Sequence, residues 1–412
     1  MPIRIEPAQL ASVLPPGGLT IVSSCSAESA LLADAVRRAG AALGSMTFTG
    51  IFVPGLNRQD WRANPDCRIL SFFQTPDLKA MGDAVEFLPL CYADIMAMLR
   101  ARRPDAALIM VSPPDADGNC SFGTQVDFTA DLWRDIPVRI AHINPAMPHT
   151  PGHRGIPFDQ LTAFFEAEQP LLAGGDDRPD ALSQQIADHI VPHVRDNSTL
   201  QTGIGKVPGA VLRSLTGRRN LRIHSGLIGE AVLDLIDAGA MAPGASATVG
   251  VAIGTQALYD RLGEPVFNFQ PVSVTHDARA IGAHEHFVGI NSAIEIDLLG
   301  QGYAELTPKG LMSGPGGASD FARGARLGGG LRIIALPASA AKDTISRIVP
   351  PGAGTGPVSL SRMDIDLVVT EHGTADLRGR GYAERAEALI AIASPAHRAR
   401  LAEAWATWSA KL

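Results

Sequence analysis

The chain has 412 residues, of which 46% are hydrophobic and 19% charged, with a formal net charge of -7. We expect two domains, because this length exceeds what one hydrophobic core usually serves. The acidic balance argues against nucleic acid as a partner, and no apolar run reaches the roughly 20 residues that a membrane helix needs.

The cysteines and the N-terminus indicate the cellular compartment in which the protein is expected. Cys25, Cys67, Cys91 and Cys120 show no CxxC spacing, which favours reduced, buried thiols over catalytic or disulfide-bonded ones. The start of the chain, MPIRIEPAQL, lacks the basic and apolar regions of a signal peptide. We therefore expect a cytoplasmic protein.

Strands and helices alternate along the first half. An apolar run at 19–24 predicts a buried strand, and 26–38 has the spacing of an amphipathic helix that Ser26 is expected to cap. Further strands are predicted at 46–53, 68–73, 106–111 and 139–143, and helices at 92–102 and 181–194. The polar turn at 115–123 resembles a calcium loop but lacks its terminal glutamate, so we expect no metal.

The second half repeats this alternation. The patterns predict strands at 220–224, 247–253, 287–298, 331–336 and 365–370, and helices beginning at 230, 255 and 383. The predicted fold class is therefore α/β, with two similar α/β domains, residues 1–194 and 195–412, built on largely parallel sheets.

A candidate site lies within residues 200–230. Gly203 and Gly205 form a loop before a predicted helix, where backbone N–H groups can meet an anion or a polarised carbonyl. The strand at 220–224 ends at His224, and small residues at 225–229 predict a corner before a helix that starts at Glu230. Open α/β sheets bind ligands at such corners.

Seven motifs, in order, resemble the acetyl-CoA hydrolase/transferase family, which includes the 4-hydroxybutyrate and acetate CoA-transferases of class I. They are residues 111–123 (VSPPDADGNCSFG), 144–148 (NPAMP), 200–205 (LQTGIG), 290–297 (INSAIEID), 316–321 (GGASDF), 333–337 (IIALP) and 369–379 (VTEHGTADLRG). The resemblance implies two similar α/β domains, a homodimer, and coenzyme A bound as acyl-CoA with a carboxylic acid as acceptor. It implies no metal.

The resemblance also implies site residues. The family's transferases attack the thioester with a glutamate in a His-Thr-Glu segment, and the matching segment here ends in Gly226, which has no carboxylate. Glu230, four residues on, is the nearest substitute. Gly316 and Gly317 resemble the family's oxyanion hole, and Asn268 a residue that contacts the acyl carbonyl.

Two further residues have open alternatives. Glu371, in the motif at 369–379, is either near the substrate carboxylate or ion-paired with Arg378 or Arg380. His224 is either a titrating site residue or a packed histidine at a strand end. Three functions remain: a CoA-transferase or acyl-CoA hydrolase with a non-standard mechanism; a CoA-thioester lyase, decarboxylase or carbon-carbon hydrolase; and a CoA-binding protein without turnover.

Overall fold

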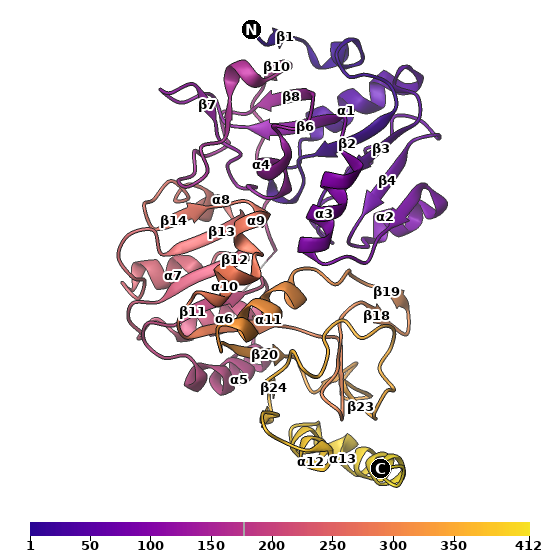
Figure 1. Cartoon of the computed structure of the whole chain (residues 1–412), viewed down its shortest axis with the longest axis vertical. Helices are drawn as coiled ribbons and strands as arrows, with labels where there is room; N and C mark the ends of the chain where they lie inside the picture. The colour runs from indigo at the N-terminus through magenta and orange to yellow at the C-terminus, as the bar shows by residue number, and fades with distance from the viewer. Residues whose placement is uncertain (176–177) are drawn as a thin grey trace. The chain divides into compact units, whose positions relative to one another are not determined.

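A computed structural model describes residues 1–175 and 178–412 (Figure 1). The chain divides into two compact units. The first comprises residues 1–175, 226–228 and 244–275, and the second comprises 176–225, 229–243 and 276–412. The domain boundary near residue 195 stays a prediction. Within the described residues, no helix is both long and apolar enough to cross a membrane.

The first unit contains an eight-stranded sheet whose neighbouring strands are all parallel (Figure 1). In spatial order the strands are β1 (Ile3–Arg4), β10 (Ala163–Glu166), β8 (Val138–Ile143), β6 (Ala106–Val111), β2 (Gly18–Val22), β3 (Met46–Thr49), β4 (Arg68–Ser71) and β5 (Val85–Phe87). Every residue of β6 is buried, which explains its uninterrupted apolar sequence.

Helices connect these strands as the alternation predicts. They are α1 (Ala30–Ala39), α2 (Pro76–Ala80), α3 (Tyr92–Arg102) and α4 (Phe128–Leu132). The cap of α1 differs from the prediction, because Ser29 Oγ accepts from Leu32 N and is the N-cap. Ser26 instead lies in a short 3-10 helix and donates its hydroxyl to the carbonyl of Ala252. Both serines precede the same apolar run, so the local pattern alone does not distinguish between them.

The first unit also takes a later segment of the chain. This segment forms β13 (Ala247–Ala252), α8 (Gln256–Tyr259), β14 (Phe267–Phe269) and α9 (Val272–Thr275). β13 and β14 pair in parallel. A small antiparallel pair, β7 (Asn119–Cys120) with β9 (Ile156–Pro157), holds the end of the polar turn at 115–123.

The second unit is built on a mostly parallel sheet. Its strands, in spatial order, are β12 (Arg222–Ile228, of which residues 222–225 belong to this unit), β11 (Thr199–Thr202), β15 (Phe287–Asn291), β20 (Leu331–Ala335), β24 (Leu367–Thr370) and the antiparallel β25 (Gly373–Asp376). Its helices are α5 (Ala181–Ile190), α6 (Lys206–Ser214), α7 (Val232–Asp237), α10 (Ala278–Gly282), α11 (Ala318–Leu327), α12 (Tyr382–Ala391) and α13 (Pro395–Ser409).

The two faces of this sheet have different covers. Leu200 and Val288 pack in a core with residues of α5 and α6. On the other face Phe287 packs with Ile281 of α10 and Phe321 of α11. Since side chains alternate along a strand, Gln201 and His224 point to the face that α10 and α11 cover, opposite to Leu200.

The strand predicted at 287–298 is wrong as one element. β15 ends at Asn291, and β16 (Glu295–Asp297) belongs to a separate small sheet with β17 (Gly302–Tyr303) and β23 (Ile348–Val349). The remaining pairs are β18 (Leu306–Thr307) with β19 (Gly310–Leu311) and β21 (Ser339–Ala340) with β22 (Ile345–Ser346). Ser292 ends β15 by donating its hydroxyl to the carbonyl of Ala335 on the neighbouring strand β20.

Candidate functional site

The predicted corner at 225–229 is displaced. β12 continues to Ile228, so Ser225 and Gly226 lie within the strand, and the turn comes at 229–231 before α7 begins at Val232. The apolar residues 227 and 228 carry the strand past the glycine. Ser225 donates its hydroxyl to the carbonyl of Thr202 at 2.9 Å. Small residues here therefore mark a strand interior.

Three histidines gather in the second unit beside β12. His224 Nδ1 and His284 Nε2 are 2.9 Å apart, with the two rings edge to face. His276 packs against Phe321 of α11, with ring centroids 4.8 Å apart. Burial, followed by the charge of His224, lowers the pKa of His276 to about 3. Burial, followed by Arg222, also lowers the pKa of His284. Both imidazoles are therefore neutral at neutral pH.

A partly buried amide pair lies on the same face of the sheet. Gln201 Nε2 donates to Asn291 Oδ1 at 3.1 Å, and Asn291 Nδ2 donates back to Gln201 Oε1 at 2.9 Å. Each residue belongs to one of the motifs that carry the resemblance, at 200–205 and 290–297. The pair thus joins the ends of β11 and β15. Together with His224, these two amides form a layer of polar side chains on one face of the sheet, which we call the polar layer.

The glycine loop at 203–205 connects β11 to α6. Gly205 is the N-cap of α6 with φ of +105°, a conformation that favours glycine. A Cβ at either Gly203 or Gly205 would meet nothing within 4 Å. Lys206, the first residue of the helix, pairs with Asp180 at 3.0 Å. The loop therefore has open space at the start of α6.

The second glycine pair begins α11. Gly316 has φ of +61°, and Gly317 is the N-cap of the ten-residue helix. A Cβ on Gly317 would lie 2.6 Å from His276 Nε2. The first N–H groups of a helix lack partners within the helix and attract negative charge. This geometry suits the oxyanion role that the resemblance implies for Gly316 and Gly317.

Replacing Gly317 with alanine should destabilise the protein by about 1–3 kcal/mol, because the new methyl group overlaps the His276 ring. Urea unfolding measures this change. Gly203→Ala is the matched control and should stay within about 0.5 kcal/mol of the parent, since its Cβ meets no neighbour. Equal effects at the two positions would contradict the close packing of His276 on Gly317.

The remaining predicted site residues have contacts of their own. Glu371 follows β24 and accepts a hydrogen bond from Ala338 N at 2.8 Å. In the described part of the chain it has no arginine partner, and Arg378 pairs with Asp376 instead. Asn268 belongs to the first unit, where it donates to Thr248 and accepts from Gln270. Glu230 lies half-buried in the turn between β12 and α7.

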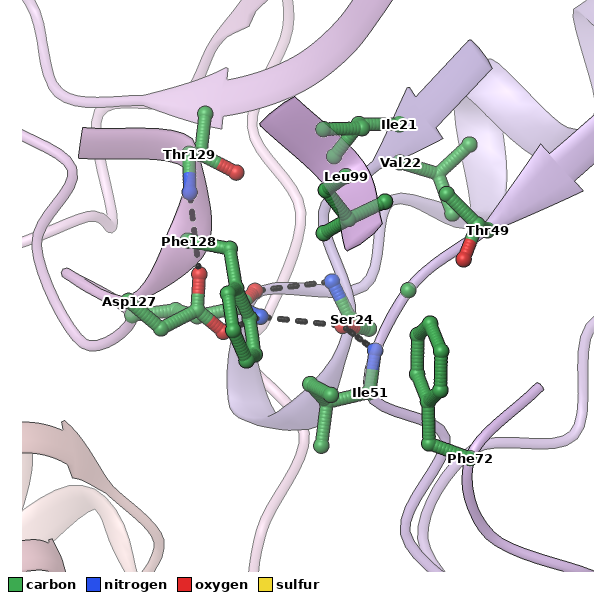
Figure 2. A pocket seen from close by; sticks show the side chains of 12 residues that line it. Ile21, Val22, Ser24, Thr49, Ile51, Phe72, Leu99, Asp127, Phe128 and Thr129 are labelled. Atoms are coloured by element: carbon green, nitrogen blue, oxygen red, sulfur yellow. Dashed lines mark hydrogen bonds between the residues drawn. The ribbon is translucent and has the colours of Figure 1, made fainter. Parts of the chain in front are cut away.

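The first unit has a small cavity of its own at the ends of β2 and β3 (Figure 2). Its volume is about 10 Å³, enough for one water molecule. The Thr49 hydroxyl lines it and has no hydrogen-bond partner among the described residues. Ser24 and Gln125 exchange two hydrogen bonds beside it, and Gln125 Nε2 donates to Asp127 at 2.7 Å.

Asp127 lines this cavity, and Cys25 follows Ser24 in the chain; both are buried and both hold their protons strongly. Burial raises the pKa of Asp127 from its usual 3.8 to about 6, although Gln125 and the N–H of Thr129 oppose the shift. Burial and then the charge of Asp127 raise the pKa of the Cys25 thiol. The four cysteines are buried and form no disulfide in the described part of the chain, which confirms the prediction of buried thiols.

The free energy of unfolding should fall as pH rises from about 4 to 6.5. Over this range the Asp127 carboxyl ionises in the unfolded chain while the folded chain keeps its proton, which costs about 3 kcal/mol in all. Asp127→Asn should flatten this slope in urea unfolding measured at several pH values. The exposed Asp66→Asn control should keep it. An unchanged slope in the Asp127 variant would mean that another titrating group causes the pH dependence of the unfolding free energy.

Sequence reasoning found some of these residues and missed others. It named His224, Gly316 and Gly317, which the structure brings near His276, but it did not name His276 or His284. Gln201 and Asn291 lie in two of the family motifs, but the sequence did not predict that their side chains form hydrogen bonds with each other. Within the described residues, no group of three or more His, Cys, Asp or Glu side chains is placed to hold a metal ion.

The fold is that of a class I CoA-transferase type of protein, as comparisons with known proteins show. RipA from Yersinia pestis has a similar structure, with a TM-score of 0.90 and 26% identity over 99% of this chain and 98% of that one. The 4-hydroxybutyrate CoA-transferase of Porphyromonas gingivalis has a TM-score of 0.81 and 30% identity, covering 97% and 96%.

Sequence comparison agrees. The family model of the acetyl-CoA hydrolase/transferase C-terminal domain matches residues 254–405. The 4-hydroxybutyrate coenzyme A transferase of Clostridium kluyveri is 36% identical over 327 residues, or 77% of this chain and 76% of that protein. The chain belongs to the acetyl-CoA hydrolase/transferase family. The predicted family and the predicted fold class, two α/β domains with largely parallel sheets, are confirmed.

Proposed function

We propose that this enzyme acts on acyl-CoA thioesters without forming a glutamyl-CoA intermediate, and that water takes the place of the missing nucleophile. One observation carries the proposal: residue 226, where the resemblance places the attacking glutamate, is glycine. Glycine has no atom that forms a thioester with CoA. The expected products are free CoA and the carboxylic acid, that is, acyl-CoA hydrolysis.

The position of Glu230 supports this proposal over a shifted transferase. Residues 226–228 are extended strand, so the chain advances about 10 Å from Gly226 before the turn that holds Glu230. A helical arrangement of residues 226–230 would have separated the two residues by about 6 Å. Glu230 is therefore a poor substitute for a carboxylate at position 226.

The other site residues have roles within this proposal. The N–H groups at Gly316 and Gly317 stabilise the oxyanion as water attacks the thioester carbonyl. Gly203 and Gly205 keep the start of α6 open for an anionic part of the CoA ester. Glu371 and Asn268 are candidates for contact with the acyl group. A homodimer is proposed on the family resemblance and is checked by light scattering on the purified protein.

Product analysis by mass spectrometry tests the function. The protein is incubated with a panel of acyl-CoAs, with and without acetate as a carboxylic acid acceptor. Free CoA with the unchanged acyl acid supports hydrolysis. If acetyl-CoA forms from another acyl-CoA in the presence of acetate, the proposed hydrolysis is contradicted and the activity is CoA transfer.

Two further outcomes decide between the remaining functions. Carbon dioxide or a shortened acyl-CoA identifies a lyase, decarboxylase or carbon-carbon hydrolase, in which the same oxyanion cradle holds a thioester enolate. CoA binding in calorimetry without any product identifies a binding protein. Heat-denatured protein is the control for spontaneous hydrolysis.

A further inference from the structure

A second pocket of the first unit lies beside the C-terminal ends of α3 and α4 (Figure 1). Its volume is about 430 Å³, within the range of about 300–1,000 Å³ that is usual for small-molecule sites. α3 ends just before β6 and α4 ends shortly before β8, so the pocket lies at the amino ends of these two paired strands. Open α/β sheets bind their substrates at the carboxyl ends. The pocket is therefore placed for a ligand other than a substrate.

Four of the residues that line this pocket are apolar. They are Leu99 of α3, Leu132 of α4, and Pro104 and Ile136 in the segments that follow these helices. All four are buried, so they form fixed parts of the wall. A ligand with an aliphatic or aromatic group gains from contact with such a wall, because the contact removes apolar surface from water.

The other three lining residues, Arg100, Arg103 and Asp135, are charged and exposed. Arg100 has a partner in Asp131, at 3.8 Å. The side chains of Arg103 and Asp135 have no hydrogen bond or ion pair within the described part of the chain, so they do not pair with each other. An unpaired cation and an unpaired anion thus line the same pocket.

Arg103 occupies a backbone position that favours glycine. It is the residue at which α3 ends, with φ of +50° and ψ of +81°. Glycine or asparagine is usual in this left-handed conformation at a helix end. Attraction to the helix dipole does not account for the arginine, because Arg100 and Arg102 already lie in the last turn of α3. A ligand for its guanidinium gives the side chain a role at this position.

We propose that this pocket binds an apolar α-amino acid as a zwitterion, with the carboxylate on Arg103, the ammonium group on Asp135 and the side chain on the apolar residues. The planar guanidinium offers two parallel N–H donors to a carboxylate, and an ammonium group donates to the oxygens of Asp135. A ligand with one charge leaves either Arg103 or Asp135 unpaired. The inference is independent of the proposed function, since none of these residues belongs to the candidate site.

Isothermal titration calorimetry with four probes tests the class of ligand. Leucine has both charges and an apolar chain. 4-Methylpentanoate lacks its amine, 3-methylbutylamine lacks its carboxylate, and glycine lacks its side chain. Leucine should bind about fivefold or more tightly than each of the other three. Equal binding of leucine and 4-methylpentanoate would overturn the zwitterion, and a failure of leucine to bind at millimolar concentrations would overturn the site.

Two variants assign the two charges. Arg103→Gly should weaken leucine binding about fivefold or more and leave the binding of 3-methylbutylamine unchanged, because this amine has no carboxylate for the guanidinium. Asp135→Asn should weaken leucine binding and leave that of 4-methylpentanoate unchanged. Arg102→Gln is the matched control at the same helix end. Arg102 does not line the pocket and pairs with Glu86 at 2.8 Å, so its loss should not change leucine binding.

Thermal unfolding separates a lost ligand contact from a damaged fold. Arg103→Gly should not lower the Tm, because glycine suits the left-handed conformation at residue 103. Leucine should raise the Tm of the wild type and of Arg102→Gln, and not that of Arg103→Gly. Leucine binding that survives both Arg103→Gly and Asp135→Asn would place the ligand elsewhere and overturn the proposal.

Discussion

Gly226→Glu is expected to give the protein a CoA-transferase activity that proceeds through a glutamyl thioester at residue 226. The variant supplies a carboxylate at the position where the family resemblance places the nucleophile, on the strand face that His224 shares. Gly226 is partly exposed, which leaves room for a side chain. Incubated with an acyl-CoA, the variant should gain the mass of bound CoA, and acetate should release it as acetyl-CoA.

Gly226→Gln is the matched control, because it has nearly the same size and no nucleophilic carboxylate. It should form neither the adduct nor acetyl-CoA. Hydroxylamine, which cleaves thioesters, should remove the adduct of the glutamate variant and leave the glutamine variant unchanged. A folded Gly226→Glu protein that forms no adduct would mean that the site has diverged beyond this one residue.

Asp366→Ala should lower the free energy of unfolding by about 3–5 kcal/mol, because it leaves a largely buried guanidinium without its carboxylate partner. Arg332 Nε and Nη2 donate to the two oxygens of Asp366 at 2.9 and 2.6 Å, and the backbone N of Arg332 donates to the same carboxylate at 3.0 Å. The side chains are 16% and 8% exposed. The pair joins the start of β20 to the start of β24. Urea unfolding measures the effect.

Asp376→Ala tests the same chemistry at the surface. Asp376 and Arg378 also form a bidentate pair, at 2.9 and 2.6 Å, but their side chains are 39% and 54% exposed. Solvent screens this pair, so its loss should cost less than about 1 kcal/mol. If the two variants lose equal stability, burial is not what makes the Arg332 pair important.

Most regular elements could be predicted because local pattern determines them. The apolar run at 106–111 is β6 and the helix predicted at 92–102 is α3, with the predicted bounds. Errors arose where a neighbour decides the outcome. Ser26 and Ser29 both suit a helix cap, and the structure uses Ser29 because Ser26 bonds to Ala252. The end of β15 depends on the contact of Ser292 with β20.

The residues of the candidate site also fall into those that the sequence predicted and those that it did not. Gly203 and Gly205 could be named from the sequence, because chain turns and helix starts have local signals. Gly316 and Gly317 were named only through the family resemblance. The small residues at 225 and 226 predicted a corner, which was wrong, because the apolar residues that follow extend the strand. No local signal marked His276 or His284.

By itself, the sequence determined the alternation of strands and helices, the family motifs and the absence of a carboxylate at residue 226. These are properties of single residues and short periods, which neighbours in the chain specify. Only the tertiary structure decided that His224 meets His284 and that Gln201 meets Asn291, pairs separated by 60 and 90 residues. Such meetings depend on strand register and on how α10 and α11 pack on the sheet, and no local pattern encodes either.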